Sequence, residues 1–339
     1  MILLFSGFSS RTMDNRKIFK FSILPITIPS NLLGIFPISI KITDTGSVKV
    51  SKFKVFYGFC ISSFLSGFAF YRLLITKSRG AESLIYKFTT IAYPIITFTA
   101  FWFFLCRAKS MSKLLEDVFS YLKFLRGNKK SYSFIFWILL GQMLYLLIVM
   151  ALYYVRLYIV WPIMYSKPFL ILDRVCEMGI FFAIPLLSLQ QANLLFFIHK
   201  VFAFLNQELK SLDPGKIFTP RSKFDLMKGK YQKIHAGSNH DLEFIADLYE
   251  KICKTCEILN FVFGAPASAS AAHTLIQTVI TLYYFLLNKS DVYVAILRIT
   301  TVNLELWILL FACEHVVNEV RGFFFELRKE VQGVVEGEK

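Results

Sequence analysis

The sequence predicts an all-α membrane protein, a polytopic helical bundle of six spans with a cytoplasmic N-terminus and cytoplasmic helical extensions. Of 339 residues, 55% are hydrophobic and only 18% are charged, whereas soluble domains carry about 25% charged residues. Six segments are long and apolar enough to cross a hydrocarbon core, which takes about 20 helical residues. This composition excludes a soluble two-domain enzyme, the ordinary expectation for the length.

The six segments differ in how clearly they indicate a span. Phe134–Tyr154 is the clearest, because it contains no charged residue. The fourth and fifth segments contain Pro185 and Pro266, which transmembrane helices tolerate as kinks. In chain order the predicted spans are Val55–Thr76, Leu84–Cys106, Phe134–Tyr154, Val175–Ile198, Ile258–Leu287 and Val292–Cys313.

A seventh apolar stretch, Ile23–Ile42, contains Pro25, Pro29 and Pro37. Each proline removes a backbone donor and clashes with the preceding helical turn. We therefore expect this stretch to lie at the interface or to pack against the bundle rather than to span.

The basic residues set the topology. With a cytoplasmic N-terminus and six spans, 29 of the 38 Lys and Arg residues fall on the cytoplasmic side and 9 on the other. This asymmetry follows the positive-inside rule. It predicts a multi-pass protein of the plasma membrane with both ends in the cytoplasm, and it accounts for the net charge of +15 without a nucleic-acid partner.

Five regions follow along the chain. Residues 1–54 form a cytoplasmic N-terminal segment, 55–198 carry spans one to four, 199–257 form a cytoplasmic helical loop, 258–313 carry spans five and six, and 314–339 form a cytoplasmic C-terminal helix. Apolar residues at helical spacing extend span four to Leu212, and a second helix begins near Asn239 or His240 and enters span five. Two amphipathic helices at this position suit an oligomer.

The cysteines predict neither a metal site nor an extracellular disulfide. Cys253 and Cys256 form a C-x-x-C pair, but no second pair or nearby His cluster completes a zinc site. We therefore interpret Cys253 and Cys256 as side chains that pack within the protein. The sequence also contains no nucleophile elbow or phosphate loop, so we expect no enzymatic activity and no cofactor.

Three motifs carry a resemblance. Leu242–Leu287 is a Leu-rich helix followed by Asn260, Phe263 and Gly264; Phe202–Leu209 reads F-A-F-L-N-Q-E-L; and Gly34–Pro37 reads G-I-F-P. In this order and spacing, over roughly residues 31–330, the chain resembles the insect gustatory receptor family of the insect chemoreceptor superfamily. The resemblance implies a subunit of a ligand-gated, non-selective cation channel that detects small organic tastants.

The resemblance also implies the partners. They are a tastant, membrane lipid and other receptor subunits in a homo- or hetero-tetramer. The Asp173-Arg174-Val175-Cys176 stretch has the D-R-x-C form seen in G-protein-coupled receptors, but it lies at the predicted outer end of span four. No G protein is therefore expected as a partner.

One family feature is missing from the sequence. The T-Y-x-x-x-x-x-Q signature of the seventh, pore-lining span does not occur, and the sequence ends after Glu314–Arg328, which resembles the helix before that span. A truncated, non-conducting or accessory receptor form is therefore the alternative expectation, and a secondary transporter is a more distant one.

Polar residues inside the spans are the first candidate site residues, because such groups are costly in a bilayer. Arg298 and Glu305 are seven residues apart on one face of span six. They either line an aqueous cavity that opens outward, or Arg298 snorkels to the surface while Glu305 pairs with a neighbouring helix. His273 and Gln277 lie one turn apart on span five, where interhelical hydrogen bonds are commoner than ligand contacts.

An aromatic cluster lies at the outer end of span three. Tyr154, Tyr158 and Trp161 are typical of an interfacial belt. The alternative, implied by the resemblance, is a tastant pocket in the outer half of spans two to six. In that case Glu177 and Arg298 would add polar contacts.

Overall fold

The computed structural model describes ten stretches of the chain. They comprise residues 28, 30–34, 38–40, 48–75, 95–121, 140–142, 144–151, 168–211, 239–287 and 292–337. Helix dominates these stretches, and the all-α prediction is confirmed.

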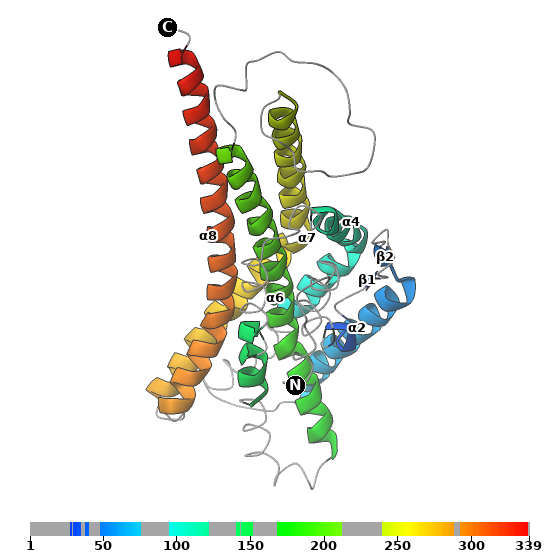
Figure 1. The fold of residues 1–339 in the computed structure, drawn as a ribbon. Coiled ribbons are helices and arrows are strands. Elements are labelled where there is room, and N and C mark those ends of the chain that lie inside the picture. The colour runs from blue at the N-terminus through cyan, green and yellow to red at the C-terminus, as the bar shows by residue number, and fades with distance from the viewer. Residues whose placement is uncertain are drawn as a thin grey trace, which may run out of the picture.

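Three very long helices form the main part of the structure. They are α6 (Pro168–Ser211, 44 residues), α7 (Asn239–Leu286, 48 residues) and α8 (Val292–Gly337, 46 residues). At 1.5 Å per residue each is about 66–72 Å long, more than twice the thickness of a hydrocarbon core. Figure 1 shows α6 and α8 side by side, and α7 also packs on both. Each helix is therefore longer than a membrane span requires.

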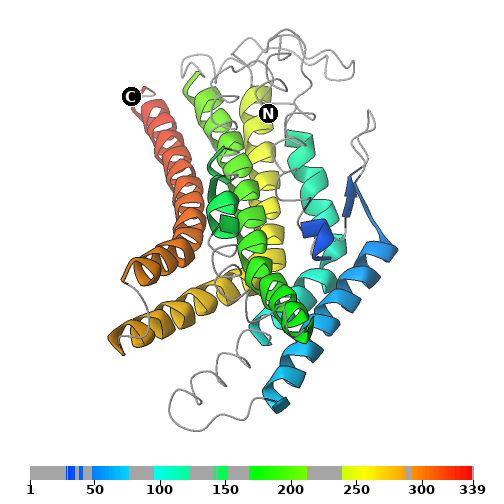
Figure 2. The same cartoon turned by 90° about the horizontal axis from the view of Figure 1, so that it is seen from below.

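The boundaries of these helices agree well with the sequence pattern. Helix continues from span four through His199 to Ser211, and α7 begins at Asn239. One boundary differs, because α6 begins at Pro168 and not at Val175. Proline is favoured in the first helical turn, where its missing N–H has no helical partner to lose. Pro266 lies inside α7, and Figure 2 shows α7 changing direction along its length.

The earlier helices are shorter. Helix α2 (Lys52–Ile75) covers nearly all of the first predicted span. An apolar helix, Ile95–Cys106, covers the end of the second, and after a turn at Arg107 the amphipathic α4 (Ala108–Tyr121) follows. A helix at Leu140–Ala151 lies within the third. The remaining parts of predicted spans two and three lie outside the described residues.

By length and hydropathy, two stretches of the described residues are sufficient to cross a membrane, Phe182–Lys210 and Ile299–Arg328. Ile95–Cys106 and Leu140–Ala151 are apolar but shorter. The count of six spans stays a prediction.

The Pro-rich N-terminal stretch is not one helix in its described part. After a helical turn ending at Leu32, Gly34 has a φ of +70°, and Ile38–Ile40 forms strand β1. This strand pairs antiparallel with β2 (Val48–Val50), Ser39 opposite Lys49. Tyr57 Oη donates a hydrogen bond to the Leu32 carbonyl (2.9 Å), so the stretch packs against α2. This contact agrees with the predicted packing of the stretch against the bundle.

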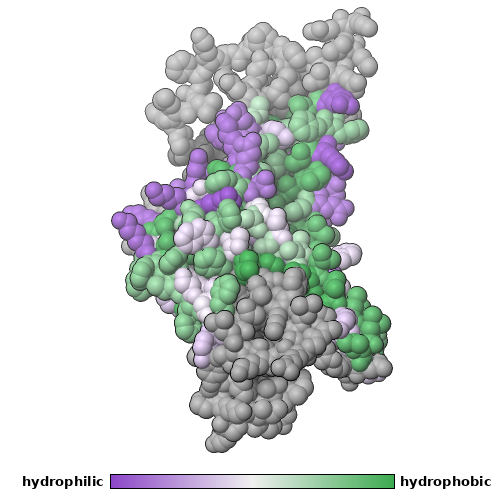
Figure 3. Space-filling view, turned by 180° about the vertical axis from the view of Figure 1, so that it is seen from behind, coloured by the Kyte–Doolittle hydropathy of each residue, from purple (hydrophilic) through white to green (hydrophobic). Residues whose placement is uncertain are grey.

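Helix α6 is the centre of the core. Every residue from Phe182 to His199 is buried, and α6 contacts α2, α4, α7 and α8. Large apolar side chains such as Trp307, Leu286 and Phe56 lie exposed on the outer faces of α8, α7 and α2. Figure 3 shows hydrophilic side chains gathered towards the end where α8 terminates and apolar ones below them. An apolar exterior of this extent suits lipid and not water.

Candidate functional site

Glu305 of α8 is the most deeply buried charged residue among the described side chains, only 1% exposed. Its Oε1 accepts two hydrogen bonds, from Ser188 Oγ of α6 (2.7 Å) and from Ser270 Oγ of α7 (2.5 Å). One carboxylate oxygen therefore joins the three long helices at a single point. We call Glu305, Ser188 and Ser270 the carboxylate triad.

An ionised Glu305 carboxylate would have little compensation for its charge. None of the ion pairs formed by the described residues involves Glu305. A buried charge normally needs a counter-charge or several donors, and two hydroxyls satisfy only part of this requirement. The triad is therefore suited to a ligand group that donates hydrogen bonds or carries positive charge.

Further buried polar residues continue from the triad along the same helices. Gln191 lies one turn after Ser188 on α6, and Thr274 one turn after Ser270 on α7. The Gln191 Oε1 and Thr274 Oγ1 atoms are buried without a hydrogen-bond partner among the described residues. Elsewhere in the core, Asn193 of α6 and Gln142 of the Leu140–Ala151 helix hydrogen-bond to each other through both of their side-chain amides. Buried polar atoms almost always have a hydrogen-bond partner, so we expect water or a ligand at the Gln191 and Thr274 atoms.

Polar groups in the core of an apolar helical bundle are costly and are usually kept for a function. Comparison with known proteins identifies the family of the chain. The model of the 7tm chemosensory receptor family matches residues 23–333. The chain belongs to this family. No curated protein matches it. The family match confirms the predicted resemblance to insect chemoreceptors, and it confirms that the chain is a membrane receptor. The chemosensory receptor family is not a family of enzymes.

In this chemosensory receptor, the sequence-predicted site residues fall into three groups. Glu305, His273 and Gln277 are buried in the core. Glu305 accepts hydrogen bonds from neighbouring helices, which agrees with the hypothesis that it pairs with a neighbouring helix. Glu177 and Arg298 lie on α6 and α8, but their side chains lie outside the described part. The aromatic cluster of Tyr154, Tyr158 and Trp161 lies outside the described residues. The aromatic pocket thus stays a prediction.

Sequence analysis of the receptor missed Ser188 and Ser270. Small hydroxyl residues in an uncharged helix look the same whether they pack or bind. Ser270 belongs to an Ala-Ser-Ala-Ser-Ala run. The other serine of this run, Ser268, is exposed, and its Oγ donates to the Gly264 carbonyl of the same helix (3.0 Å). Glu305 could have indicated Ser188 and Ser270, because a carboxylate inside a membrane span requires hydrogen-bond donors from adjacent helices.

The extensions of the receptor's long helices are joined by a second set of contacts. Asn206 Nδ2 of α6 donates to the Glu319 carbonyl (2.9 Å) and to Glu319 Oε2 (2.5 Å) on α8. Lys210 pairs with Glu326 (3.3 Å), and the ring of Tyr249 on α7 stacks on Phe323 with centroids 4.5 Å apart. These contacts hold α6, α7 and α8 together beyond the triad.

The C-x-x-C pair of the receptor lies on the extension of α7. The described residues contain no group of metal-ligating side chains suited to a metal ion. Burial raises the pKa of the Cys256 thiol to about 12, and Cys253 and Glu257 nearby act in the same direction. A protonated thiol is a poor nucleophile and metal ligand, so these observations favour packing.

Proposed function

We propose that this chemosensory receptor is a gustatory receptor, a subunit of a ligand-gated, non-selective cation channel that detects small organic tastants at the plasma membrane. The carboxylate triad carries the proposal, since it places one buried acceptor at the point where α6, α7 and α8 meet. The N-terminus is cytoplasmic, as the distribution of basic residues favours. Other receptor subunits complete a tetramer in the surrounding lipid.

The tastant offers donors to the triad. A hydroxyl or ammonium group that engages Glu305 competes with the Ser188 and Ser270 hydroxyls for the same oxygen. The partnerless atoms of Gln191 and Thr274 supply further polar contacts. Buried polar groups discriminate strongly against a ligand that leaves them unpaired, so we expect specificity for a molecule with several donors.

The signal is transmitted along continuous helices. Each of α6, α7 and α8 runs without interruption from the triad to the extension contacts of Asn206, Tyr249 and their partners. A ligand that binds one arrangement of the three helices better than another shifts the population towards it. Exchange of the triad hydrogen bonds would provide that difference in affinity.

The test is to express the full chain in cells and to record whole-cell currents while sugars, amines and other small tastants are applied. Tastant-evoked cation currents support the proposal. Currents that require a co-expressed receptor subunit favour the accessory form, and accumulation of a tastant without current favours a transporter.

The triad is tested in the same cells with Glu305→Gln. The amide keeps the volume but loses the charge, and we expect the half-maximal tastant concentration to rise at least tenfold. Glu314→Gln is the matched control, since Glu314 lies on the same helix away from the buried core. Equal responses of both variants at normal surface expression would exclude the triad from ligand recognition.

A further inference from the structure

Exposed lysines lie on three neighbouring elements, away from the carboxylate triad. Lys49 lies on β2, Lys52 begins α2, and Lys109 and Lys113 lie one turn apart on α4; all four side chains are exposed. Helix α4 packs on β2, and Figure 1 shows β2, α2 and α4 on the same side of the molecule. We call Lys49, Lys52, Lys109 and Lys113 the basic patch.

Helix α2 places one part of the basic patch at a membrane surface. It has 24 residues and covers nearly all of the first predicted span. At 1.5 Å per residue it is about 36 Å long, close to the ~30 Å of a hydrocarbon core. We therefore expect its first residue, Lys52, to lie where the headgroups of one leaflet begin.

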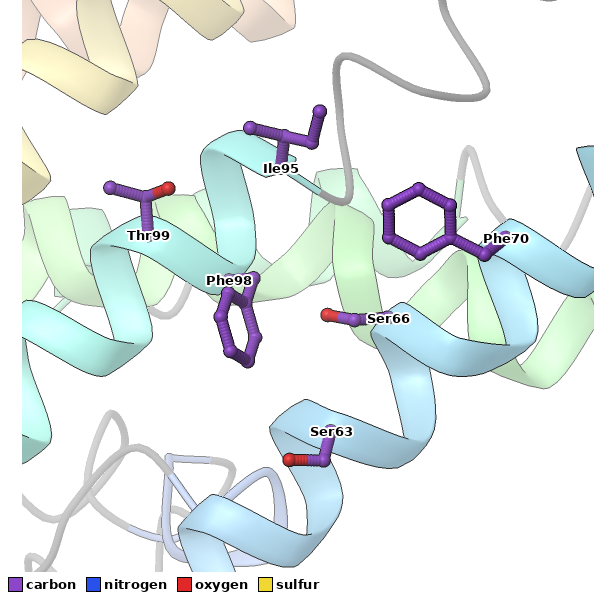
Figure 4. Close-up of a pocket in the computed structure, with 6 residues that line it drawn as sticks. All are labelled: Ser63, Ser66, Phe70, Ile95, Phe98 and Thr99. Atoms are coloured by element: carbon purple, nitrogen blue, oxygen red, sulfur yellow. The ribbon is translucent and has the colours of Figure 1, made fainter.

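The helix that precedes α4 ends at the same surface. Ile95–Cys106 runs antiparallel beside α2, and both helices contribute side chains to one pocket between them (Figure 4). A Cβ on Gly58 would lie 3.1 Å from Leu105 Cδ2, which places the end of this helix beside the second turn of α2. Lys52 and Lys109 both lie within about two helical turns of this contact. The whole basic patch is therefore expected at one level of the bilayer.

The basic patch has an excess of positive charge. The acidic residues of α4, Glu116 and Asp117, provide two carboxylates against four ammonium groups. The extension of α7 shows the contrast, because Lys251 and Lys254 there each pair with a carboxylate one turn earlier (both 2.6 Å). The ion pairs found between described residues include none of the four patch lysines. The basic patch is therefore suited to an anion.

Exposed aromatic side chains adjoin the basic patch on its membrane side. Phe53 and Phe56, in the first turns of α2, are 76% and 67% exposed, and Trp102 and Phe103 near the end of the opposite helix are also exposed. A soluble anion would contact the lysines alone, whereas a phospholipid offers a charged headgroup and hydrocarbon chains together. Clusters of Lys and Arg beside a membrane span attract anionic lipids. The lysines and the aromatic side chains together favour an anionic phospholipid.

We propose that the basic patch binds an anionic phospholipid, its headgroup held by the four lysines and its acyl chains against Phe53 and Phe56. Zwitterionic phosphatidylcholine has no net charge and lacks the attraction. The proposal goes beyond tastant detection, because it assigns a second ligand to a surface separate from the carboxylate triad.

The experiment uses the full chain in phosphatidylcholine nanodiscs that contain a small fraction of a photoreactive phosphatidylserine, and mass spectrometry locates the label. We expect label within residues 49–56 or 102–113. Unlabelled phosphatidylserine should displace the probe, and added phosphatidylcholine should not. The probe binds without a tastant or a current, so a failure of the proposed channel function leaves this result unchanged.

Matched variants test the role of charge. Lys109→Gln/Lys113→Gln should reduce labelling at least about tenfold, since each lysine near the surface contributes about fivefold to binding. Lys109→Arg/Lys113→Arg keeps the charge and should retain labelling. Lys251→Gln/Lys254→Gln is the control, because it removes two exposed lysines that already have acidic partners.

Three results would overturn the proposal. The first is full labelling of the folded Lys109→Gln/Lys113→Gln variant. The second is equal labelling by a photoreactive phosphatidylcholine that phosphatidylserine does not displace. The third is displacement of the probe by soluble glycerophosphoserine as readily as by the lipid, which would indicate a site for a free anion. Competition in the unmodified protein decides the question even if a variant fails to fold.

Discussion

The backbones of Gly34 and Gly58 touch where the N-terminal stretch crosses α2. A Cβ on Gly34 would lie 2.5 Å from Gly58 Cα, and a Cβ on Gly58 would collide with the Gly34 carbonyl oxygen. Gly34 also has a φ of +70°, which other residues rarely adopt. The glycine of the G-I-F-P motif is therefore required by close packing and by backbone conformation.

Gly58→Ala should destabilise the receptor by about 1–3 kcal/mol, because the added methyl group meets backbone and not a side chain that can move. Gly67→Ala is the matched control on the same helix, where a Cβ meets nothing within 4 Å. It should be neutral or slightly stabilising. Thermal unfolding of both purified variants in detergent measures the difference, and equal melting temperatures would refute the close contact.

Ser270→Ala should destabilise the receptor by about 1–3 kcal/mol, since it removes one of two donors to a buried carboxylate. Ser268→Ala makes the same substitution two residues away on an exposed position and should have little effect. In a double-mutant cycle with Glu305→Gln, the measured coupling energy should reach at least about 0.5 kcal/mol. Additive unfolding free energies would show that Ser270 and Glu305 do not interact.

Phe323→Ala should loosen the extension of α8 from α7, because the buried Phe323 ring stacks on Tyr249. The expected loss of unfolding free energy is about 3 kcal/mol. Phe325→Ala, on the exposed side of the same helix turn, is the control and should lose less than about 1 kcal/mol. Limited proteolysis should then cut near residue 323 in the first variant only.

Cys256 should react slowly with iodoacetamide between about pH 7 and 9. Burial raises its pKa to about 12, while an unfolded cysteine titrates near about 8.5. The unfolded chain loses this proton first as pH rises, so the contribution of Cys256 to stability falls above about pH 8.5. Peptide mass spectrometry should show at least roughly 100-fold faster labelling of Cys256 after denaturation. Comparable rates in the folded protein would contradict its partly buried position.

Local pattern predicted the helices well because helical periodicity and proline positions act over a few residues. The extension of span four and the start of α7 near Asn239 were both visible in this way. The start of α6 at Pro168 was missed, since a proline in the first turn of a helix looks like a helix breaker unless the boundary is already known.

The sequence by itself determined the class of the protein, a helical membrane protein, because apolar run length and basic residues report directly on contact with lipid. The receptor role came from the resemblance of its motifs to those of insect chemoreceptors. It also singled out Glu305, since one carboxylate in a span is conspicuous. Only the tertiary structure decided which hydroxyls donate hydrogen bonds to the Glu305 carboxylate. Ser188 and Ser270 lie 117 and 35 residues from Glu305, and their meeting depends on how α6, α7 and α8 rotate and pack. That rotation is a property of the whole interface between helices, which no local pattern records.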